Sequence, residues 1–310
     1  MRTNFDSNEQ EVRMTTGQLY ATPKHIDSPE DCFFYHFMEL PEVGTVGSTW
    51  DLRKCTNEYL GNEDYSGKRV LDVGAASGFV TFELERRGAQ VVSFDLPSVE
   101  SWNLVPHASL RQHWPDLLNS RAECHRKMQN AYWYAHRKLR SRARVHYGDI
   151  YNLPLELGTF DIVYLGMVLP HLRDPFQALY SASRLAGERL IVTNPGRKPT
   201  WWRRLLGQER RQAKFMPSKE NRKTDVWWAL SATCIERMLA VLGFEVERRV
   251  VAIAECNENG RVRSRKNVAI VAQRVQNSPE GLCVKQNQCK GDQKESHRLA
   301  AAEAGKLTAS

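Results

Sequence analysis

The 310-residue chain lacks several features that would direct it to particular classes of protein. No apolar run approaches the roughly 20 residues that a membrane-spanning helix requires. The first residues, MRTNFDSNEQ, contain neither the apolar core of a secretory signal nor the acid-free composition of a transit peptide, so we expect a cytoplasmic protein. The seven cysteines are scattered, and no two have the C-x-x-C spacing. We therefore expect reduced thiols and no metal site.

The most informative pattern in the chain is VLDVGAASGFVTFELERRGAQVVSFD at residues 70–95. Residues 70–73 form an apolar run typical of a buried parallel strand. Residues 79–87 predict an amphipathic helix, and Gly88 is placed to end it. A second apolar run covers residues 91–94. This order predicts one β-α-β unit of a parallel sheet.

The turn inside this unit indicates which kind of cofactor it holds. Gly74 and Gly78 allow the backbone to turn sharply and to approach a ligand where a Cβ atom would collide. The pattern D-x-G-x-x-x-G begins with an acid, Asp72, and differs from the G-x-G-x-x-G spacing that places a pyrophosphate at a helix N-terminus. An acid at this position suits a ligand with positive charge and an ammonium donor. Asp95, at the end of the second strand, can accept hydrogen bonds from both ribose hydroxyls.

This pattern resembles motif I of the class I S-adenosylmethionine-dependent methyltransferases, and the resemblance continues over roughly 200 residues. It implies an α/β fold with a doubly wound, mostly parallel, seven-stranded sheet of the Rossmann-like methyltransferase type. The resemblance also implies an antiparallel edge hairpin, helical lid insertions and S-adenosylmethionine as cofactor. Many members of the family carry a middle glycine where this chain has Ala76.

The resemblance further implies roles for particular residues. Asp149 would accept a hydrogen bond from the adenine amino group, and Ile150 would cover the ring. The segment FDIVYLGMVLPHLRDP, residues 160–175, resembles the fourth strand and the loop beneath the methionine moiety. The complete set of residues that we expect at the cofactor is Asp72, Gly74, Ala76, Gly78, Asp95, Leu96, Asp149, Ile150 and Gly166.

Later segments complete the expected sheet. Asp174 can cap a helix that starts at Pro175 and that Gly187 would end, and Ser231 can cap another. Two β runs follow, at residues 244–254 and 268–275, with the turn-rich NENG between them.

The composition of the chain suggests three parts. We expect a flexible N-terminal segment at residues 1–30, a methyltransferase domain at 31–275 and a disordered C-terminal tail at 276–310, which is too polar to bury a core.

Two insertions, at about residues 98–142 and 196–226, follow strands at the carboxyl edge of the sheet. Basic residues outnumber acidic ones nine to two between residues 102 and 144 and ten to two between 196 and 223. Aromatic residues, including Trp133 and Trp201, lie among these cations. We expect both insertions to cover the cofactor and to build the acceptor pocket.

We expect the acceptor to be a small molecule, and two alternatives stay open. Aromatic insertions suit a closed apolar pocket for a small molecule, methylated on oxygen or nitrogen. Arginines among aromatic residues also suit RNA. Two segments, GMVLPHLRDPFQAL and VWWALSATCIERMLAVLGFEVE, resemble the methyltransferase subgroup related to the tRNA wobble-uridine carboxymethyl-transferring enzyme. The second alternative is a non-catalytic protein that only binds the cofactor. The sequence does not indicate an oligomeric state.

An oxygen or nitrogen acceptor loses a proton when it is methylated, and a general base accelerates such a step by roughly 10²- to 10⁴-fold. His171, on the loop after the fourth strand, is the first candidate by position. The alternative is that its imidazole only orients that loop. His36 is the second candidate, because we expect its aromatic segment, DCFFYHFMEL, to fold over the site. Its alternative is a packing role among aromatic neighbours.

Overall fold

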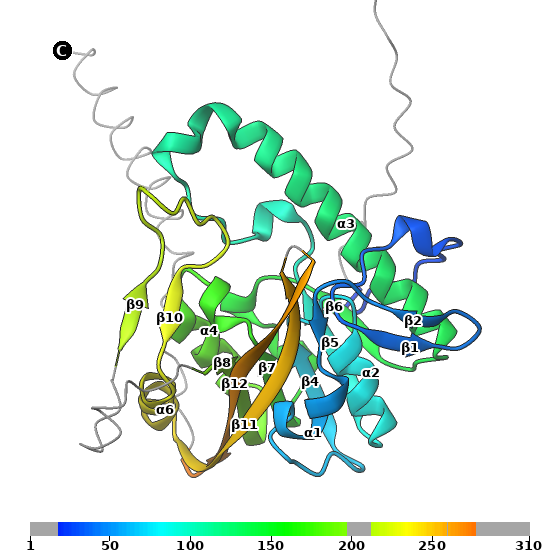
Figure 1. The fold of residues 1–310 in the computed structure, drawn as a ribbon. Helices are drawn as coiled ribbons and strands as arrows, with labels where there is room; N and C mark the ends of the chain where they lie inside the picture. Colours follow the sequence, from blue (N-terminus) through cyan, green and yellow to red (C-terminus); the bar gives the residue numbers. More distant parts are fainter. Residues whose placement is uncertain (1–17, 197–211, 259, 277–310) are drawn as a thin grey trace, which may run out of the picture. The chain divides into compact units, whose positions relative to one another are not determined.

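The computed structural model describes residues 18–196, 212–258 and 260–276. Its main element is an eight-stranded sheet in the order β3-β11-β12-β8-β7-β4-β5-β6 (Figure 1). The strands of this sheet are β3 (Trp50–Asp51), β4 (Arg69–Val73), β5 (Gln90–Asp95), β6 (Arg144–Tyr147), β7 (Phe160–Gly166), β8 (Ala186–Pro195), β11 (Phe244–Glu258) and β12 (Arg261–Arg274). Strands β4 to β8 pair in parallel, whereas β12 is antiparallel to both β8 and β11. The predicted sheet with its antiparallel hairpin is confirmed, and the two-residue β3 adds an eighth strand.

Helices cover both faces of the sheet. One face packs against α1 (Thr56–Tyr59), α2 (Phe79–Arg86) and α3 (Trp114–Lys138), and the other packs against α4 (Pro175–Ser183) and α6 (Ala232–Val241). Because neighbouring side chains of a strand point to opposite faces, both faces must be apolar, and this explains the continuous apolar runs in the sequence.

Shorter elements connect these layers. The two small hairpins are formed by β1 (Met38–Leu40) with β2 (Gly44–Val46), and by β9 (Ala213–Phe215) with β10 (Trp228–Leu230). The 3-10 helices are η1 (Pro29–Asp31), η2 (Arg53–Cys55), η3 (Val99–Ser101), η4 (Ala108–His113), η5 (Ile150–Asn152), η6 (Leu155–Leu157) and η7 (Leu169–His171). Among the helices of the described residues, none combines the length and the apolar composition of a membrane-crossing segment.

Three of the four helix-end predictions are confirmed. Gly88, with a φ of 86°, follows α2, which ends at Arg86. Asp174 accepts from the Gln177 amide at the start of α4, and Ser231 accepts from the Cys234 amide at the start of α6. The prediction for Gly187 is wrong, because α4 ends at Ser183 and Gly187 lies inside β8. A Cβ atom at Gly187 would come within 2.9 Å of the Thr159 side chain, so the glycine allows β7 and β8 to approach closely instead of ending a helix.

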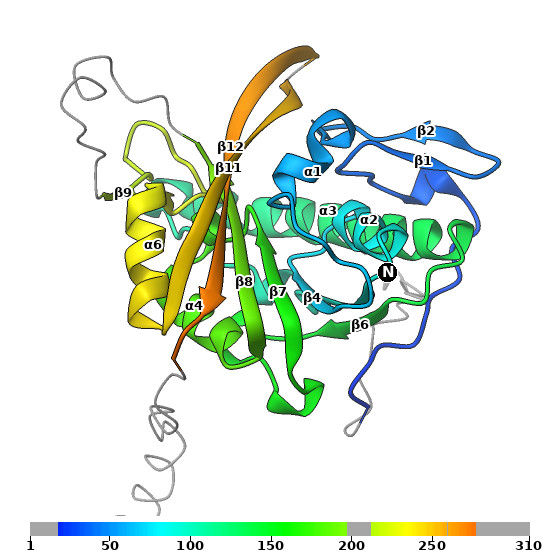
Figure 2. The same ribbon diagram turned by 90° about the horizontal axis from the view of Figure 1, so that it is seen from below.

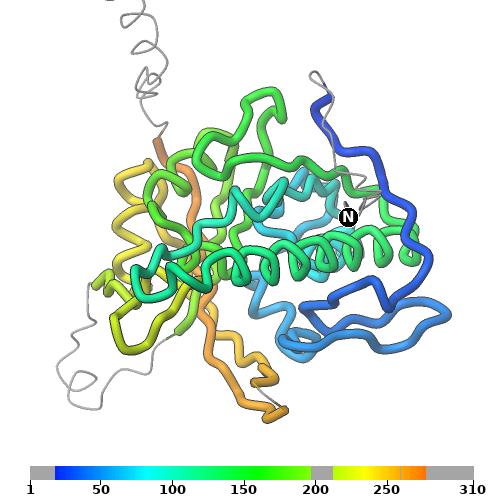
Figure 3. The backbone as a smooth tube through the Cα atoms, turned by 90° about the horizontal axis from the view of Figure 1, so that it is seen from above, coloured from blue at the N-terminus to red at the C-terminus, as the bar shows by residue number. Residues whose placement is uncertain are grey.

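Residues 18–30, which we expected to be part of a flexible segment, pack on the domain. The Ala21 amide donates to the Val145 carbonyl over 2.8 Å, and the His146 ring donates to the Leu19 carbonyl over 2.6 Å. Arg137 of α3 donates to the Ile26 carbonyl, and Figure 3 shows this segment alongside α3. These contacts cover the free edge of β6, where backbone groups would otherwise lack partners. The remainder of the N-terminal segment, residues 1–17, and the C-terminal tail from residue 277 lie outside the described residues.

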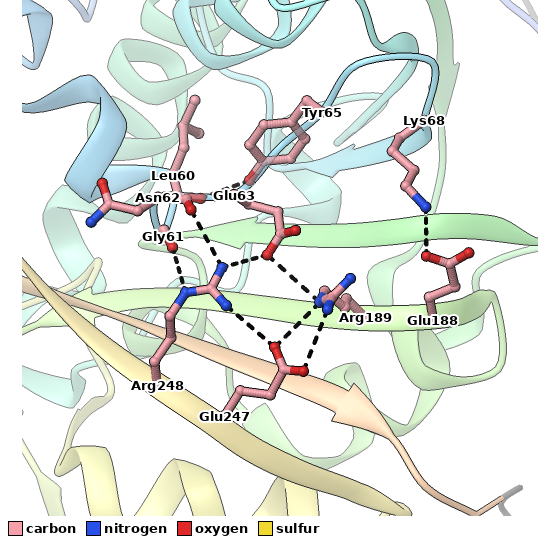
Figure 4. Close-up of polar contacts among 10 residues, drawn as sticks. All are labelled: Leu60, Gly61, Asn62, Glu63, Tyr65, Lys68, Glu188, Arg189, Glu247 and Arg248. Atoms are coloured by element: carbon pink, nitrogen blue, oxygen red, sulfur yellow. Dashed lines mark hydrogen bonds and ion pairs between the residues drawn. The ribbon is translucent and has the colours of Figure 1, made fainter.

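The amino-terminal ends of the strands are joined by an ion-pair network (Figure 4). Arg248 at the start of β11 contacts both Glu63 and Glu247 and donates to the Gly61 carbonyl over 3.1 Å. Arg189 of β8 contacts the same two carboxylates, at 3.6 and 3.4 Å. Every charge in this network has an opposite partner, so it stabilises the end of the sheet away from the predicted site.

The β11–β12 hairpin is longer than the sequence predicted. Its register continues to the pair Glu258 and Arg261, whereas β8 pairs only with residues 267–273 of β12. The outer part of the hairpin therefore extends past β8, as Figure 2 shows, and the short β3 pairs with β11 there.

Candidate active site

The predicted glycine turn connects β4 with α2 at the carboxyl edge of the sheet. Gly74 has a φ of 86°, and a Cβ atom there would come within 2.5 Å of the Val168 side chain, on the loop after β7. Gly78 has a φ of 92° at the start of α2. The Gly74 amide donates to the Phe94 carbonyl over 2.8 Å, which ties the turn to β5. Only glycine allows the turn and the loop after β7 to lie this close.

Ala76 takes the left-handed conformation inside this turn, with a φ of 50°. This conformation costs a non-glycine residue about 1 to 2 kcal/mol. The Ala76 amide donates to the Asp95 carboxylate over 2.7 Å, and this charge-assisted hydrogen bond helps to hold the strained residue in place. The alanine therefore departs from the family pattern in its side chain, while its backbone conformation is one that favours glycine.

Asp95 lies at the end of β5 and reaches back to the glycine turn. One carboxylate oxygen accepts from Ala76 and the other accepts from the Leu96 amide over 2.7 Å. Burial raises the pKa of Asp95, and the nearby His125 opposes this effect. The Gly148 amide donates to the Asp95 carbonyl, so the loop after β6 is attached at the same place.

Asp72 lies in β4, directly before the turn, and its side chain is almost completely buried. Its carboxylate accepts from the Thr81 hydroxyl over 2.6 Å. Thr81 also contacts Ser93, which contacts the Tyr132 hydroxyl of α3. Burial raises the pKa of Asp72 to about 7. A cationic ligand group near this carboxylate would favour its ionised form.

The other predicted cofactor residues lie at the ends of the next strands. Asp149 is exposed after β6 and accepts from the Tyr151 amide over 2.9 Å, whereas its neighbour Ile150 is buried. Gly166 ends β7, and a Cβ atom there would come within 2.8 Å of the Tyr164 ring. The parallel register places the ends of β4, β5, β6 and β7 next to one another.

His36 lies on the glycine turn. Its backbone amide donates to the Ser77 hydroxyl over 3.3 Å, and its ring lies 6.0 Å from the ring of Phe79. Burial lowers the pKa of His36 to about 4, so the imidazole is neutral at pH 7 and is a weaker base than an exposed imidazole. The contact between His36 and Ser77 agrees with the expectation that the aromatic segment folds over the site.

His171 lies on η7, after β7. Its Nδ1 atom is 2.5 Å from the Asp225 backbone carbonyl. Because a carbonyl can only accept, Nδ1 carries the proton, and the neutral ring then presents Nε2 as an acceptor. Asp225 belongs to the second insertion, and no motif in the sequence marked it.

The two predicted insertions contact each other and the loop after β7. The Val105 amide donates to the Thr224 carbonyl over 2.8 Å, and the His107 ring donates to the Lys223 carbonyl over 2.8 Å. Trp227 donates from its ring to the Asn103 carbonyl and from its amide to the Pro170 carbonyl. Residues 102–107 and 223–227, which we call the insertion lid, therefore form one connected cover beside His171.

Trp133 belongs to the insertion that we expected to build the acceptor pocket, but it lies in the core instead. Trp133 is 2% exposed in the core between α3 and the sheet, and its ring donates to the Tyr147 hydroxyl over 3.1 Å. The C-terminal half of α3 packs on the sheet, so its aromatic residues belong to the core. Trp201, the other predicted pocket tryptophan, lies outside the described residues.

Two buried ring nitrogens near the carboxyl edge test whether the residues fit the cofactor. Within the described ranges, Nδ1 of His36 and Nε2 of His125 have no hydrogen-bond partner. Buried polar atoms without partners are uncommon in folded proteins, and a bound ligand is one way to satisfy them. Together with the carboxylates of Asp72 and Asp95 and the glycine turn, these atoms fit S-adenosylmethionine, which carries hydroxyl and ammonium groups. The described residues hold no group of three or more His, Cys, Asp or Glu that could bind a metal ion.

A family model described as a methyltransferase domain matches residues 51–248, more than half of the chain. The chain belongs to this methyltransferase family and is an S-adenosylmethionine-dependent methyltransferase. A search of curated proteins finds no match.

Solved methyltransferase structures resemble the chain at low sequence identity. The magnesium protoporphyrin IX methyltransferase of Synechocystis PCC 6803 with bound SAH is 16% identical, with 71% of this chain and 80% of that chain covered and a TM-score of 0.44. A SAM-dependent methyltransferase from Aquifex aeolicus is 18% identical, with 71% and 89% covered and a TM-score of 0.43. The Burkholderia thailandensis 1,6-didemethyltoxoflavin-N1-methyltransferase is 13% identical, with 73% and 78% covered and a TM-score of 0.43. These similarities carry no argument about the acceptor.

Proposed function

We propose that this methyltransferase transfers its methyl group to an oxygen or nitrogen of a small-molecule acceptor. The cofactor supplies an already activated methyl group. The protein has to hold the acceptor in line with that group, exclude water and take up the proton that the acceptor loses. The observation that carries the proposal is the insertion lid, because the hydrogen bonds at Val105, His107 and Trp227 connect both insertions beside the candidate base. A connected cover of this kind suits a small enclosed acceptor.

The charges on α3 also support a small acceptor over RNA. Arg126 and Lys127 both contact Glu123, at 2.7 and 3.7 Å, and Arg121 lies 3.8 Å from Asp225. RNA binding depends on cations that neutralise phosphates and release counterions. Cations that already have carboxylate partners inside the protein are less suited to that role.

The proposed proton acceptor is His171, with His36 as the second candidate. The hydrogen bond to the Asp225 carbonyl fixes the tautomer in which Nε2 of His171 can accept a proton. His36 also has a buried ring nitrogen without a partner in the described part of the chain, and it lies nearer to the glycine turn. The proposed cofactor contacts are those of the nine residues predicted from the sequence.

An assay of methyl transfer from labelled cofactor into a cell extract tests the acceptor class. We expect label in the small-molecule fraction, unchanged by ribonuclease. Ribonuclease-sensitive label that also falls steeply with salt would favour the alternative, an RNA- or tRNA-modifying methyl- or carboxymethyltransferase. Cofactor binding without any transfer would favour the non-catalytic alternative.

A variant of the second insertion sharpens this assay. Joint replacement of Arg203, Arg204, Arg210 and Arg211, which lie outside the described residues, should leave most transfer to a small acceptor intact. An RNA-directed enzyme should lose its activity in the same variant while it still binds the cofactor.

A further inference from the structure

His125 is a buried residue of α3 that the proposed reaction does not use. It is 8% exposed, and its Nε2 atom has no hydrogen-bond partner among the residues that the structure describes. Most buried polar atoms have a partner in the protein, in water or in a ligand. This nitrogen is therefore a candidate for a hydrogen bond to a ligand.

The face of α3 that carries His125 lies on the segment directly after β5. Gln129, one helical turn further on, donates to the Leu96 carbonyl over 3.2 Å and approaches the Pro97 carbonyl at 3.5 Å. Residues four apart on a helix share a face, so His125 lies over the same segment, which begins at Leu96, the residue after Asp95. The opposing electrostatic effects of Asp95 and His125 on each other's pKa agree with this proximity.

The imidazole of His125 also packs against an aromatic residue of the first insertion. The Trp102 ring lies 6.3 Å from the His125 ring, and the Arg121 guanidinium lies 5.4 Å from the centre of the Trp102 ring. Both contacts come from the first insertion. His125 therefore has a defined position beside the acid that is expected to bind the ribose.

We propose that His125 is a cofactor-binding residue whose Nε2 atom bonds one hydroxyl of the cofactor ribose, while Asp95 bonds the other. The chemistry of the pair supports this division. Burial lowers the pKa of His125, so the ring is neutral at pH 7 and only one of its nitrogens carries a proton. The Leu96 backbone raises the pKa of His125, which is the effect of a carbonyl that accepts from a ring N–H. With that proton on Nδ1, Nε2 and the Asp95 carboxylate are two neighbouring acceptors, which match the two donors of a vicinal diol.

Calorimetric titration with S-adenosylhomocysteine and its 2′-deoxy and 3′-deoxy analogues tests the proposal without any acceptor. Replacing His125 by Phe removes both ring nitrogens and keeps most of the volume. We expect this variant to bind S-adenosylhomocysteine about 3- to 10-fold more weakly, the effect of losing one hydrogen bond. One deoxy analogue should bind the variant and the wild-type protein equally, because the hydroxyl that His125 contacts is already missing. His113→Phe, a change at an exposed residue of the same insertion, is the matched control and should bind all three ligands like the wild type.

Two outcomes would overturn the proposal. One is unchanged affinity of His125→Phe for S-adenosylhomocysteine, and the other is an equal loss for all three ligands, which would indicate a packing role only. If His125→Phe does not fold, the wild-type protein and Asp95→Ala decide. Both deoxy analogues should bind the wild type more weakly than S-adenosylhomocysteine does, and Asp95→Ala should lose discrimination against only one of them. Loss of discrimination against both would assign both hydroxyls to Asp95. The inference rests on the proposed function only through the cofactor, so an RNA acceptor found in the transfer assay would leave it standing.

Discussion

Replacing Asp72 by asparagine should stabilise the folded domain at neutral pH. The carboxyl group is 1% exposed, and burial raises its pKa from the ordinary 3.8 to about 7. Between these two values the folded protein keeps a proton that the unfolded chain has lost. The free energy of unfolding should therefore fall as the pH rises through this window and level off above about 7. Since a shift of one pKa unit is worth about 1.4 kcal/mol, the ionised Asp72 carboxylate destabilises the folded state by about 4 kcal/mol above pH 7.

Urea unfolding of the wild type and of Asp72→Asn across this pH window measures the effect. The amide oxygen of asparagine can still accept from Thr81, so the packing is kept. Part of the pH dependence should remain in the variant, because burial also raises the pKa of Asp95. Thr81→Val is the control: it removes a hydrogen bond that lowers the Asp72 pKa, so the fall in the free energy of unfolding should continue to a higher pH with an unchanged slope. If Asp72→Asn and the wild type have the same slope, the buried carboxyl is not the cause.

Three further variants test the placement of single residues. Asp95→Ala should weaken S-adenosylmethionine binding by about 1.5 to 3 kcal/mol in a calorimetric titration, the value of charge-assisted hydrogen bonds, and unchanged affinity would remove Asp95 from the site. His171→Ala should lower turnover while cofactor affinity stays nearly intact; normal turnover would leave His171 with only an orienting role and make His36 the next residue to test. Trp133→Ala should lower the free energy of unfolding by about 3 to 5 kcal/mol in urea, as expected for a buried aromatic residue. A stable Trp133→Ala protein that binds the acceptor poorly would contradict the core position.

The sequence predicted the β-α-β unit and the positions of the candidate cofactor residues within it because their signals are local. Gly74 and Gly78 mark a turn that other residues take only with strain, and Asp95 follows an apolar strand whose end must lie at the carboxyl edge. Ala76 shows the strength of the same constraint, since its backbone takes the left-handed conformation without being glycine. The caps at Asp174 and Ser231 were predictable for a similar reason, because each side chain bonds an amide three residues away.

The positions that could not be predicted depend on contacts between distant segments. Both Trp133 and His125 belong to α3, but only the packing of the helix decides that one lies in the core and the other beside Asp95. The polar residues 18–30 gave no sign that they would pair with the edge of β6. Asp225 is far from His171 in the sequence, and nothing local shows that its carbonyl meets the imidazole.

The position of β12 within the sheet bears on how the chain folds as it is synthesised. β12 is the neighbour of β8, although it is the last strand of the sheet to leave the ribosome. Until then, one edge of β8 has no partner, and the apolar side chains around Ile270 and Val271 are not yet in the core. The hairpin with β11 is local, so it can form quickly once both strands are made. Completion of the sheet therefore waits for translation to reach the C-terminal end of β12, and a nascent chain arrested before that point would expose an open strand edge to aggregation.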